Sequence, residues 1–277
     1  MQPLAQKVAQ EIISLIDQDK LVLPTMPEMA LKVQDAARDP DAGIMDLSKV
    51  ISNDAALTAR IIKVANSPLF RAPREIEDLN MALSRMGMES TANLATGLAM
   101  EQMFQATSDL IDKRMRAVWA SSSEIAGICH VLCKHYTKLR PDQAALAGLV
   151  FQIGVLPILS YAENHPSLLR DSITLDAVIE EVHPLIGVKI LDTWEFPNEL
   201  RQVPLLYRDY TADKPTPDYA DIVTVAMLQS WAGTSKVADI DYASVKSFGR
   251  LGLEAEIEST VAEDLSEDME AAMSLFS

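Results

Sequence analysis

Cysteine and histidine side chains can bind metals or act as nucleophiles and bases, and this chain contains few of them. Two cysteines and four histidines occur among 277 residues. His130 and Cys133 are three positions apart, so on a helix they would share a face and could offer two metal ligands. Two ligands do not make a site, and nothing nearby in the sequence clearly completes it. We therefore expect Cys129 and Cys133 to be small buried apolar side chains.

The remaining histidines and the paired carboxylates favour structural roles. His183 precedes a proline, and we expect it to begin a helix as a cap or packing residue. His135 falls near a predicted helix end, where a charged imidazole is favourable, and His165 falls in a predicted loop. Glu180 and Glu181 are adjacent, and adjacent helical residues point to different faces. We expect these two carboxylates to lie at the surface rather than to act as an acid/base pair.

Sequence motifs and charge exclude several classes of function. The chain has no GxxxxGK[ST] loop, no GxSxG elbow and no CxxC pair, so common nucleotide and acyl-transfer machinery is missing at motif level. Its formal net charge of −16 repels nucleic-acid phosphates and anionic lipid headgroups. We expect neither a nucleic acid nor a membrane as partner. Few thiols, no secretory segment and no window approaching a membrane span together predict a cytoplasmic protein.

The apolar residues recur with a helical period almost throughout, and no run alternates long enough to predict a strand. Helix-breaking residues and candidate caps such as Asp54 separate the helices. The sequence thus predicts an all-α fold. The predicted helices span about residues 4–16, 27–37, 44–51, 54–66, 76–86, 89–104, 112–136, 143–161, 183–194 and 218–232, and an acidic amphipathic helix follows at the C-terminus, with an apolar residue at every fourth position from Ile257 to Met273.

Four segments of the chain form one pattern: LPTMP at residues 23–27, VISNDAALTAR at residues 50–60, VANSP at residues 64–68 and ALSRMG at residues 82–87. Together they resemble the HDOD domain, a bacterial signalling family, and the likeness covers about residues 20–235. One segment, VISNDAALTAR at residues 50–60, departs from the family pattern by placing Ala55 after Asp54, where the family usually has proline.

HDOD domains are related to HD-type metal phosphohydrolases, and this resemblance implies where metal ligands would stand. Ser121 occupies the position of the first histidine, Phe151 and Gln152 replace the His-Asp pair, and His183 is retained. Past the WEFP sequence at residues 194–197, where the family often has two histidines, the chain has Tyr207 and Arg208. The late acidic position aligns best with Met227, with Asp221 nearby.

A divalent metal needs three or four N, O or S ligands that converge on one point. A benzyl ring cannot bind a metal, and of the expected ligands His183 alone clearly survives. We therefore expect no catalytic residues, no metal and no cofactor. The replaced positions would form a vestigial pocket of Ser121, Phe151, Gln152, His183, Tyr207 and Arg208.

A polar stretch of mixed charge at about residues 108–116 predicts a boundary between two packed helical lobes, at residues 1–108 and 109–277. The second lobe resembles the HD bundle. With no fused signalling domain in this chain, we expect a regulatory protein that acts through protein partners in a signalling pathway. Two alternatives stay open: a metal-dependent phosphohydrolase with an atypical site, and a nucleotide or anion sensor that uses the vestigial pocket. The candidate surface for a partner comprises Asp54, Arg60, Asn66 and Ser67, together with the acidic C-terminal helix.

Overall fold

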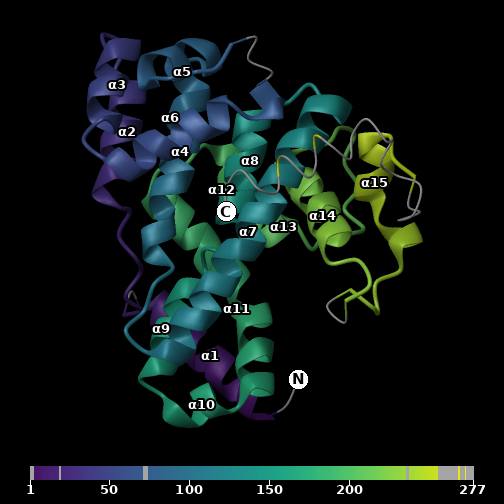
Figure 1. The fold of residues 1–277 in the computed structure, drawn as a ribbon. Coiled ribbons are helices and arrows are strands. Elements are labelled where there is room, and N and C mark those ends of the chain that lie inside the picture. The colour runs from purple at the N-terminus through teal and green to yellow at the C-terminus, as the bar shows by residue number, and fades with distance from the viewer. Residues whose placement is uncertain are drawn as a thin grey trace.

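The computed structural model describes residues 3–18, 20–70, 74–234 and 237–254, together with residues 268 and 272. Within these ranges the chain is helical with no strand, as the sequence predicts. Figure 1 shows a column of long helices, with α1 (Pro3–Asp17) at one end and a cluster of shorter helices at the other.

The first cluster contains the helices that the sequence predicts most closely. Side-chain caps set their starts: Asp54 accepts from the backbone N–H of Leu57 at 2.9 Å, and Asp78 accepts from that of Met81 at 2.8 Å. The members are α2 (Glu28–Arg38), α3 (Ile44–Ile51), α4 (Ala55–Ala65), η1 (Pro68–Phe70), α5 (Leu79–Met86), α6 (Met88–Ala99) and η2 (Met100–Met103).

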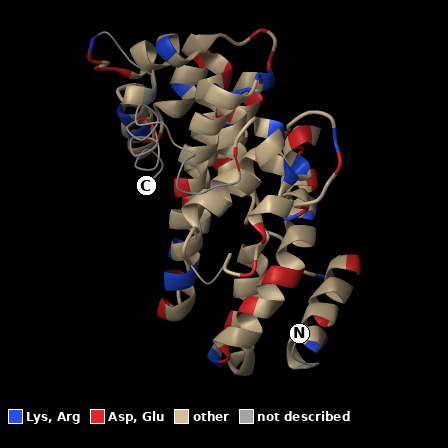
Figure 2. Cartoon of the chain, turned by 90° about the vertical axis from the view of Figure 1, so that its right-hand side faces the viewer, with Lys and Arg blue, Asp and Glu red and all other residues tan. Residues whose placement is uncertain are grey.

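The second half is built on α7 (Asp109–Tyr136), which packs along α8 (Pro141–Val150) more extensively than any other described pair of helices. Around this pair lie α9 (Val155–Glu163), α10 (Pro166–Arg170), α11 (Ser172–Thr193), α12 (Asn198–Arg201), α13 (Val203–Leu206), α14 (Tyr219–Ser230), η3 (Tyr242–Ser244) and α15 (Lys246–Leu251). Acidic and basic residues are interspersed over the helices of both halves in Figure 2.

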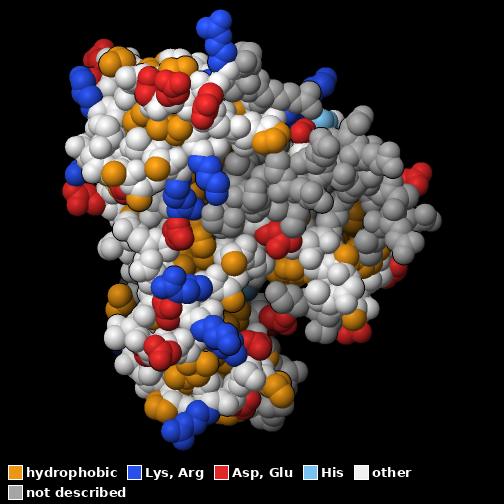
Figure 3. Space-filling view, viewed as in Figure 1, with side chains coloured by type: hydrophobic (Ala, Val, Ile, Leu, Met, Phe, Trp, Pro, Cys, Tyr) orange, Lys and Arg blue, Asp and Glu red, His pale blue; other side chains and the backbone are white. Residues whose placement is uncertain are grey.

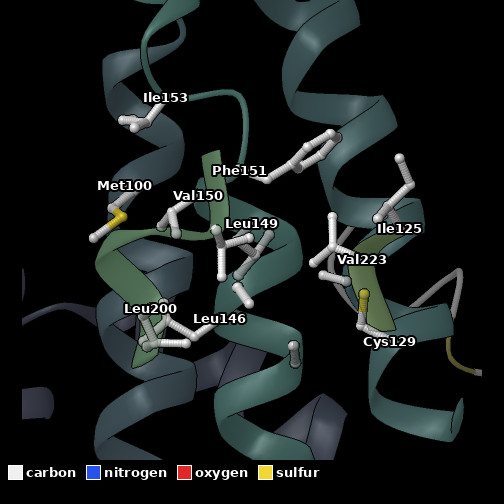
Figure 4. Close-up of a cluster of buried hydrophobic side chains, with 14 of the residues drawn as sticks. Met100, Ile125, Cys129, Leu146, Leu149, Val150, Phe151, Ile153, Leu200 and Val223 are labelled. Carbon is white, nitrogen blue, oxygen red and sulfur yellow. The ribbon is translucent and has the colours of Figure 1, made fainter. Parts of the chain in front are cut away.

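Residues 141–163 form the apolar centre. By length and by a mean hydropathy of 1.8 they could cross a membrane, contrary to our expectation that no window comes near this limit, but 83% of the most apolar window is buried inside the protein. The single helix predicted at 143–161 is in fact two, because a turn at residues 151–154 separates α8 from α9. Figure 4 shows Cys129 among these core side chains, and both cysteines are buried, as predicted.

Helix α1 packs on α11, far along the chain, rather than on the helices that directly follow it (Figure 1). The Lys189 ammonium group donates to the carbonyl of Ile16 at 2.8 Å, and the Tyr161 hydroxyl donates to the Glu11 carboxylate at 2.8 Å. The division of the chain at residue 108 stays a prediction, but α1 contacts the second of the two predicted lobes.

The prediction that His183 begins a helix is wrong. Asp171 caps α11 by accepting from the backbone N–H of Thr174 at 3.0 Å, and the helix continues past Pro184 to Thr193. Proline has no N–H, so it leaves a carbonyl one turn earlier without its usual donor and disfavours this position. Buried side chains on both sides of the proline, His183 and Ile186 among them, stabilise the continuous helix.

The predicted acidic C-terminal helix lies outside the described residues except at two positions. Asp268 and Ala272 are both helical and buried. The Asp268 carboxylate lies 3.5 Å from Nε2 of His135, near the end of α7. These two residues therefore belong to the protein's packed interior.

Close contact between α7 and α8 depends on Gly148, because a Cβ atom there would lie 2.6 Å from Cα of Ala126. We predict that Gly148→Ala separates the two helices and lowers the free energy of unfolding by about 1–3 kcal/mol. Gly249→Ala is the matched control, since that helical glycine has open space around it and alanine favours a helix by about 1 kcal/mol. Urea unfolding of both variants measures the difference, and equal stability of the two would contradict this account of the contact.

Candidate functional site

Five of the six predicted pocket residues line one pocket of about 320 Å³: Ser121, Gln152, His183, Tyr207 and Arg208. They come from α7, the turn after α8, α11 and the segment after α13, so four distant stretches of chain converge here. Phe151 lies behind the pocket, fully buried, with its ring edge-on to that of Tyr207 at a centroid distance of 5.1 Å. Figure 3 shows a hollow between the column of α9–α11 and the part of the molecule that carries α14 and α15.

Two glycines allow the turn and α13 to approach His183 this closely. A Cβ atom on Gly154 would lie 2.0 Å from the carbonyl oxygen of His183, and one on Gly187 would lie 2.7 Å from Cβ of Pro204. The turn at residues 151–154 therefore rests directly on the backbone of α11. This contact fixes Phe151 and Gln152 beside the imidazole.

The imidazole of His183 is buried and bonded to a tyrosine. Its Nε2 atom lies 3.0 Å from the hydroxyl of Tyr207, and its Nδ1 atom is enclosed, with no hydrogen-bond partner among the described residues. Burial, aided by the positive charge of Arg208, lowers the pKa of His183 to about 3. Burial also raises the pKa of Tyr207. At neutral pH the pair is therefore an uncharged imidazole and a protonated phenol.

Acidic residues of α11 pair with two arginines at the pocket wall. Arg208 lies 3.5 Å from the Glu180 carboxylate, and Arg114 of α7 lies 2.7 Å from that of Asp176. Asp176 and Glu180 are four residues apart and so share a helix face. The Glu180 side chain is 66% exposed, consistent with a surface position rather than an acid/base pair.

The sequence reasoning missed Arg114, Asp176 and Trp231 as pocket residues. Nε1 of Trp231 donates to the Ser121 hydroxyl at 3.3 Å and so links the end of α14 to α7. The spacing of Asp176, Glu180 and His183 on one helix could have indicated their shared face. That signal is hidden when the helix is taken to begin at residue 183.

The late acidic position supplies no ligand to this pocket. Met227 is buried in the core. The Asp221 carboxylate accepts hydrogen bonds from Arg250 at 2.5 and 3.1 Å and from Ser247 at 2.7 Å, and it lies 3.0 Å from the Lys214 ammonium group. Burial alone would raise the pKa of Asp221, but these donors lower it below its usual value. This carboxylate therefore ties two segments to α14: α15, through Ser247 and Arg250, and the loop before α14, through Lys214.

The pocket side chains do not fit a divalent cation. Nε2 of His183 is taken by a phenol, Phe151 has no donor atom, and Gln152 offers a neutral amide. The carboxylates at the wall, Asp176 and Glu180, are paired with arginines. Throughout the described part of the chain, no three or more His, Cys, Asp or Glu side chains are grouped so that they could hold a metal ion. A stable site requires such convergence.

The four residues of the candidate partner surface have intramolecular contacts of their own. Asp54 caps α4, and Arg60 forms an ion pair with Glu101. The Asn66 side chain donates to the carbonyl of Ile76 at 2.7 Å and accepts from its N–H at 2.8 Å, which ties the segment before α5 to the end of α4. Ser67 is buried and contributes little surface. Contact of the others with a partner stays a prediction.

Comparison with known structures finds this fold in other bacterial proteins. A crystal structure from Shewanella amazonensis SB2B, named a putative metal-dependent phosphohydrolase, is 27% identical with a TM-score of 0.88 over 100% of both chains. An HDOD domain protein of unknown function from Geobacter sulfurreducens has a TM-score of 0.65 at 18% identity over 97% of both chains. The latter likeness shows the fold alone.

Sequence comparison leads to the family. An uncharacterized protein of Treponema pallidum is 25% identical over 211 residues, which is 71% of this chain and 39% of that protein, so the chain spans well under half of its relative. The model of the HDOD domain matches residues 23–208. These residues include α2 to α13 and all six predicted pocket positions, and the chain belongs to the HDOD family.

Proposed function

We propose that this HDOD protein is a non-catalytic regulator that acts through contact with protein partners. The observation that carries the proposal is the hydrogen bond between His183 and Tyr207, backed by the ring of Phe151. A metal hydrolase must leave its ligand atoms free to converge on the ion and must activate a water on it. Here the surviving imidazole is instead bonded to a tyrosine within a packed aromatic cluster.

Hydrolysis by an atypical metal site is the alternative that the name of the Shewanella relative suggests. It would need new ligands beside His183. The nearest acidic side chains are Asp176 and Glu180 at the pocket wall, and each would first have to leave its arginine. Moving both would leave Arg114 and Arg208 without their counter-ions, which argues against this route.

Binding of a nucleotide or small anion without turnover is a second candidate function. Arg208 is the observation in its favour, because a guanidinium can bind phosphate through two parallel hydrogen bonds, and it lines the pocket together with Arg114. However, the acids of α11 already balance both charges. An anion would have to compete with Glu180 and Asp176, so we rank this function second.

Metal analysis and assays of turnover test the proposal directly. After dialysis against a chelator, we expect titration with Mn²⁺ or Zn²⁺ to show no saturable site, and we expect no hydrolysis of bis-p-nitrophenyl phosphate. The His183→Gln variant should behave like the wild type in both measurements. One equivalent of metal that is lost in His183→Gln, with turnover that is lost with it, would replace the proposal by catalysis. Titration with ATP and inorganic phosphate in the same experiment tests the second candidate.

Partner binding is tested with a charge reversal that leaves the caps of α4 intact. Lys63 is exposed on α4, within the segment from Asp54 to Ser67. We expect Lys63→Glu to weaken capture of partner proteins from the source cells at least fivefold, as quantified by mass spectrometry. Lys7→Glu on α1 is the matched control, since Lys7 is also an exposed helical lysine. The proposed surface is contradicted if both variants retain the same partners at wild-type yield.

The pH dependence of stability tests the uncharged state of the buried imidazoles. Burial lowers the pKa of His183 to about 3 and that of His130 to about 4, whereas both titrate near 6.5 in the unfolded chain. Below pH 6.5 the unfolded state therefore binds more protons, so stability is present above this pH and is lost as the pH falls. We expect a loss of about 2 kcal/mol per histidine between pH 7 and 5.

Urea unfolding at several pH values measures this loss, and His183→Gln should remove about half of it. A denaturation midpoint that does not change between pH 7 and 5 would mean that the histidines are not held uncharged.

A further inference from the structure

A second cavity, of about 280 Å³, lies where the first helical cluster meets α7 and α8. It shares no lining residue with the pocket around His183. Its walls are largely apolar and come from both sides of the junction: Val64, Phe70, Met86 and Leu94 from the first cluster, and Leu146 and Leu149 from α8. An unfilled apolar cavity forfeits packing contacts along its walls, so an occupant of matching shape would stabilise the junction.

Five residues with polar or charged side chains line this cavity: Ser90, Asn93, His130, Lys134 and Asp142. His130 lines it, and the ring of Phe70 lies 5.9 Å from the imidazole. Pro141 also lines this cavity. Because proline has no N–H, the backbone of Pro141 can accept a hydrogen bond from the imidazole but cannot donate one. Burial lowers the pKa of His130 to about 4, so at neutral pH the imidazole is uncharged, and one of its two nitrogens carries a lone pair and can only accept.

The neighbouring polar residues also leave an acceptor. The Asn93 amide donates its N–H to the Asp142 carboxylate at 2.6 Å, and Arg140 donates to the same carboxylate at 2.7 Å. The Asp142 charge is thus balanced by an arginine, and the carbonyl oxygen of Asn93 is the acceptor that remains on this side chain. Lys134 and Asp142 bring one charge of each sign to a wall that is otherwise largely apolar. A charged ligand would therefore lose its hydration here without meeting an excess of the opposite charge.

We propose that this cavity is a binding site for a compact, uncharged molecule with an apolar body and one hydrogen-bond donor, such as an aromatic alcohol or amine. The apolar walls receive the body, and His130 accepts from the donor. The volume lies at the small end of ligand pockets. Because the walls come from both helical groups, the occupant stabilises their contact, so the site gives the regulator a small-molecule input separate from the pocket of His183.

Indole and 1-methylindole are a matched pair of probes, since they share the ring system but the second has no N–H. We expect indole to bind the wild-type protein saturably in calorimetric titration and to raise its melting temperature. 1-Methylindole should bind at least about fivefold more weakly, because it leaves an acceptor unpaired in an apolar site. His130→Leu should remove this preference between the two probes.

Ser90→Leu tests the location, because Ser90 lines the cavity from α6 and a larger side chain would fill it. We expect this variant to weaken indole binding at least tenfold. Ala59→Leu, at an exposed position of α4, should bind as the wild type does. The proposal is overturned if indole shows no saturable binding to the wild type, or if the wild type binds both probes equally. Unchanged binding by a folded Ser90→Leu variant would also overturn it.

Discussion

The hydrogen bond between His183 and Tyr207 is the interaction on which the account of this molecule depends. It joins a helix to the segment after α13 and closes over a buried aromatic ring at residue 151. In an HD-type hydrolase this place would have to be open and rich in charged ligands. In this HDOD protein a pocket is present, but its histidine is buried, bonded to Tyr207 and uncharged at neutral pH. Ser121 accepts from Trp231, the carboxylates at the wall pair with arginines, and Nδ1 of His183 has no partner among the described residues.

The surrounding fold holds this arrangement tightly. Gly154 lets the turn after α8 lie against the carbonyl of His183, and Gly187 lets Pro204 approach α11 from another side. These backbone contacts place Phe151 and Gln152, which stand where the resemblance to HD-type hydrolases implies metal ligands. The scaffold therefore persists although the chemistry of the side chains has changed, which is consistent with a role in regulation.

Much of the fold could be predicted from local signals. The helix predicted at residues 44–51 has the same bounds as α3. In the structure the side chains of Asp54 and Asp218 cap α4 and α14, close to where the sequence predicts these helices to begin. What the sequence could not show is decided by contacts between distant segments. Packing on both sides of Pro184 carries α11 through a residue that normally ends a helix, and nothing local indicates that α1 packs on α11.

The site, like the fold, could be predicted only where a local motif marks its residues. Five of the six positions that the resemblance implied line one pocket. Arg114 and Asp176 carry no motif and are found only once α7 and α11 are packed together. For Ser67 a position in the family motif suggested a surface for a partner, whereas the folded chain buries it. Motif position alone does not tell a binding residue from one that stabilises a turn.

The central claim is that Tyr207 and Phe151 occupy the space that a metal and its ligands would need. Its most direct test is anomalous diffraction from crystals grown with millimolar Mn²⁺. We predict no anomalous peak within coordination distance of His183, and a Tyr207 hydroxyl within hydrogen-bond distance of Nε2. A strong peak bound to the imidazole, with Tyr207 displaced and other side chains gathered around the ion, would contradict the claim.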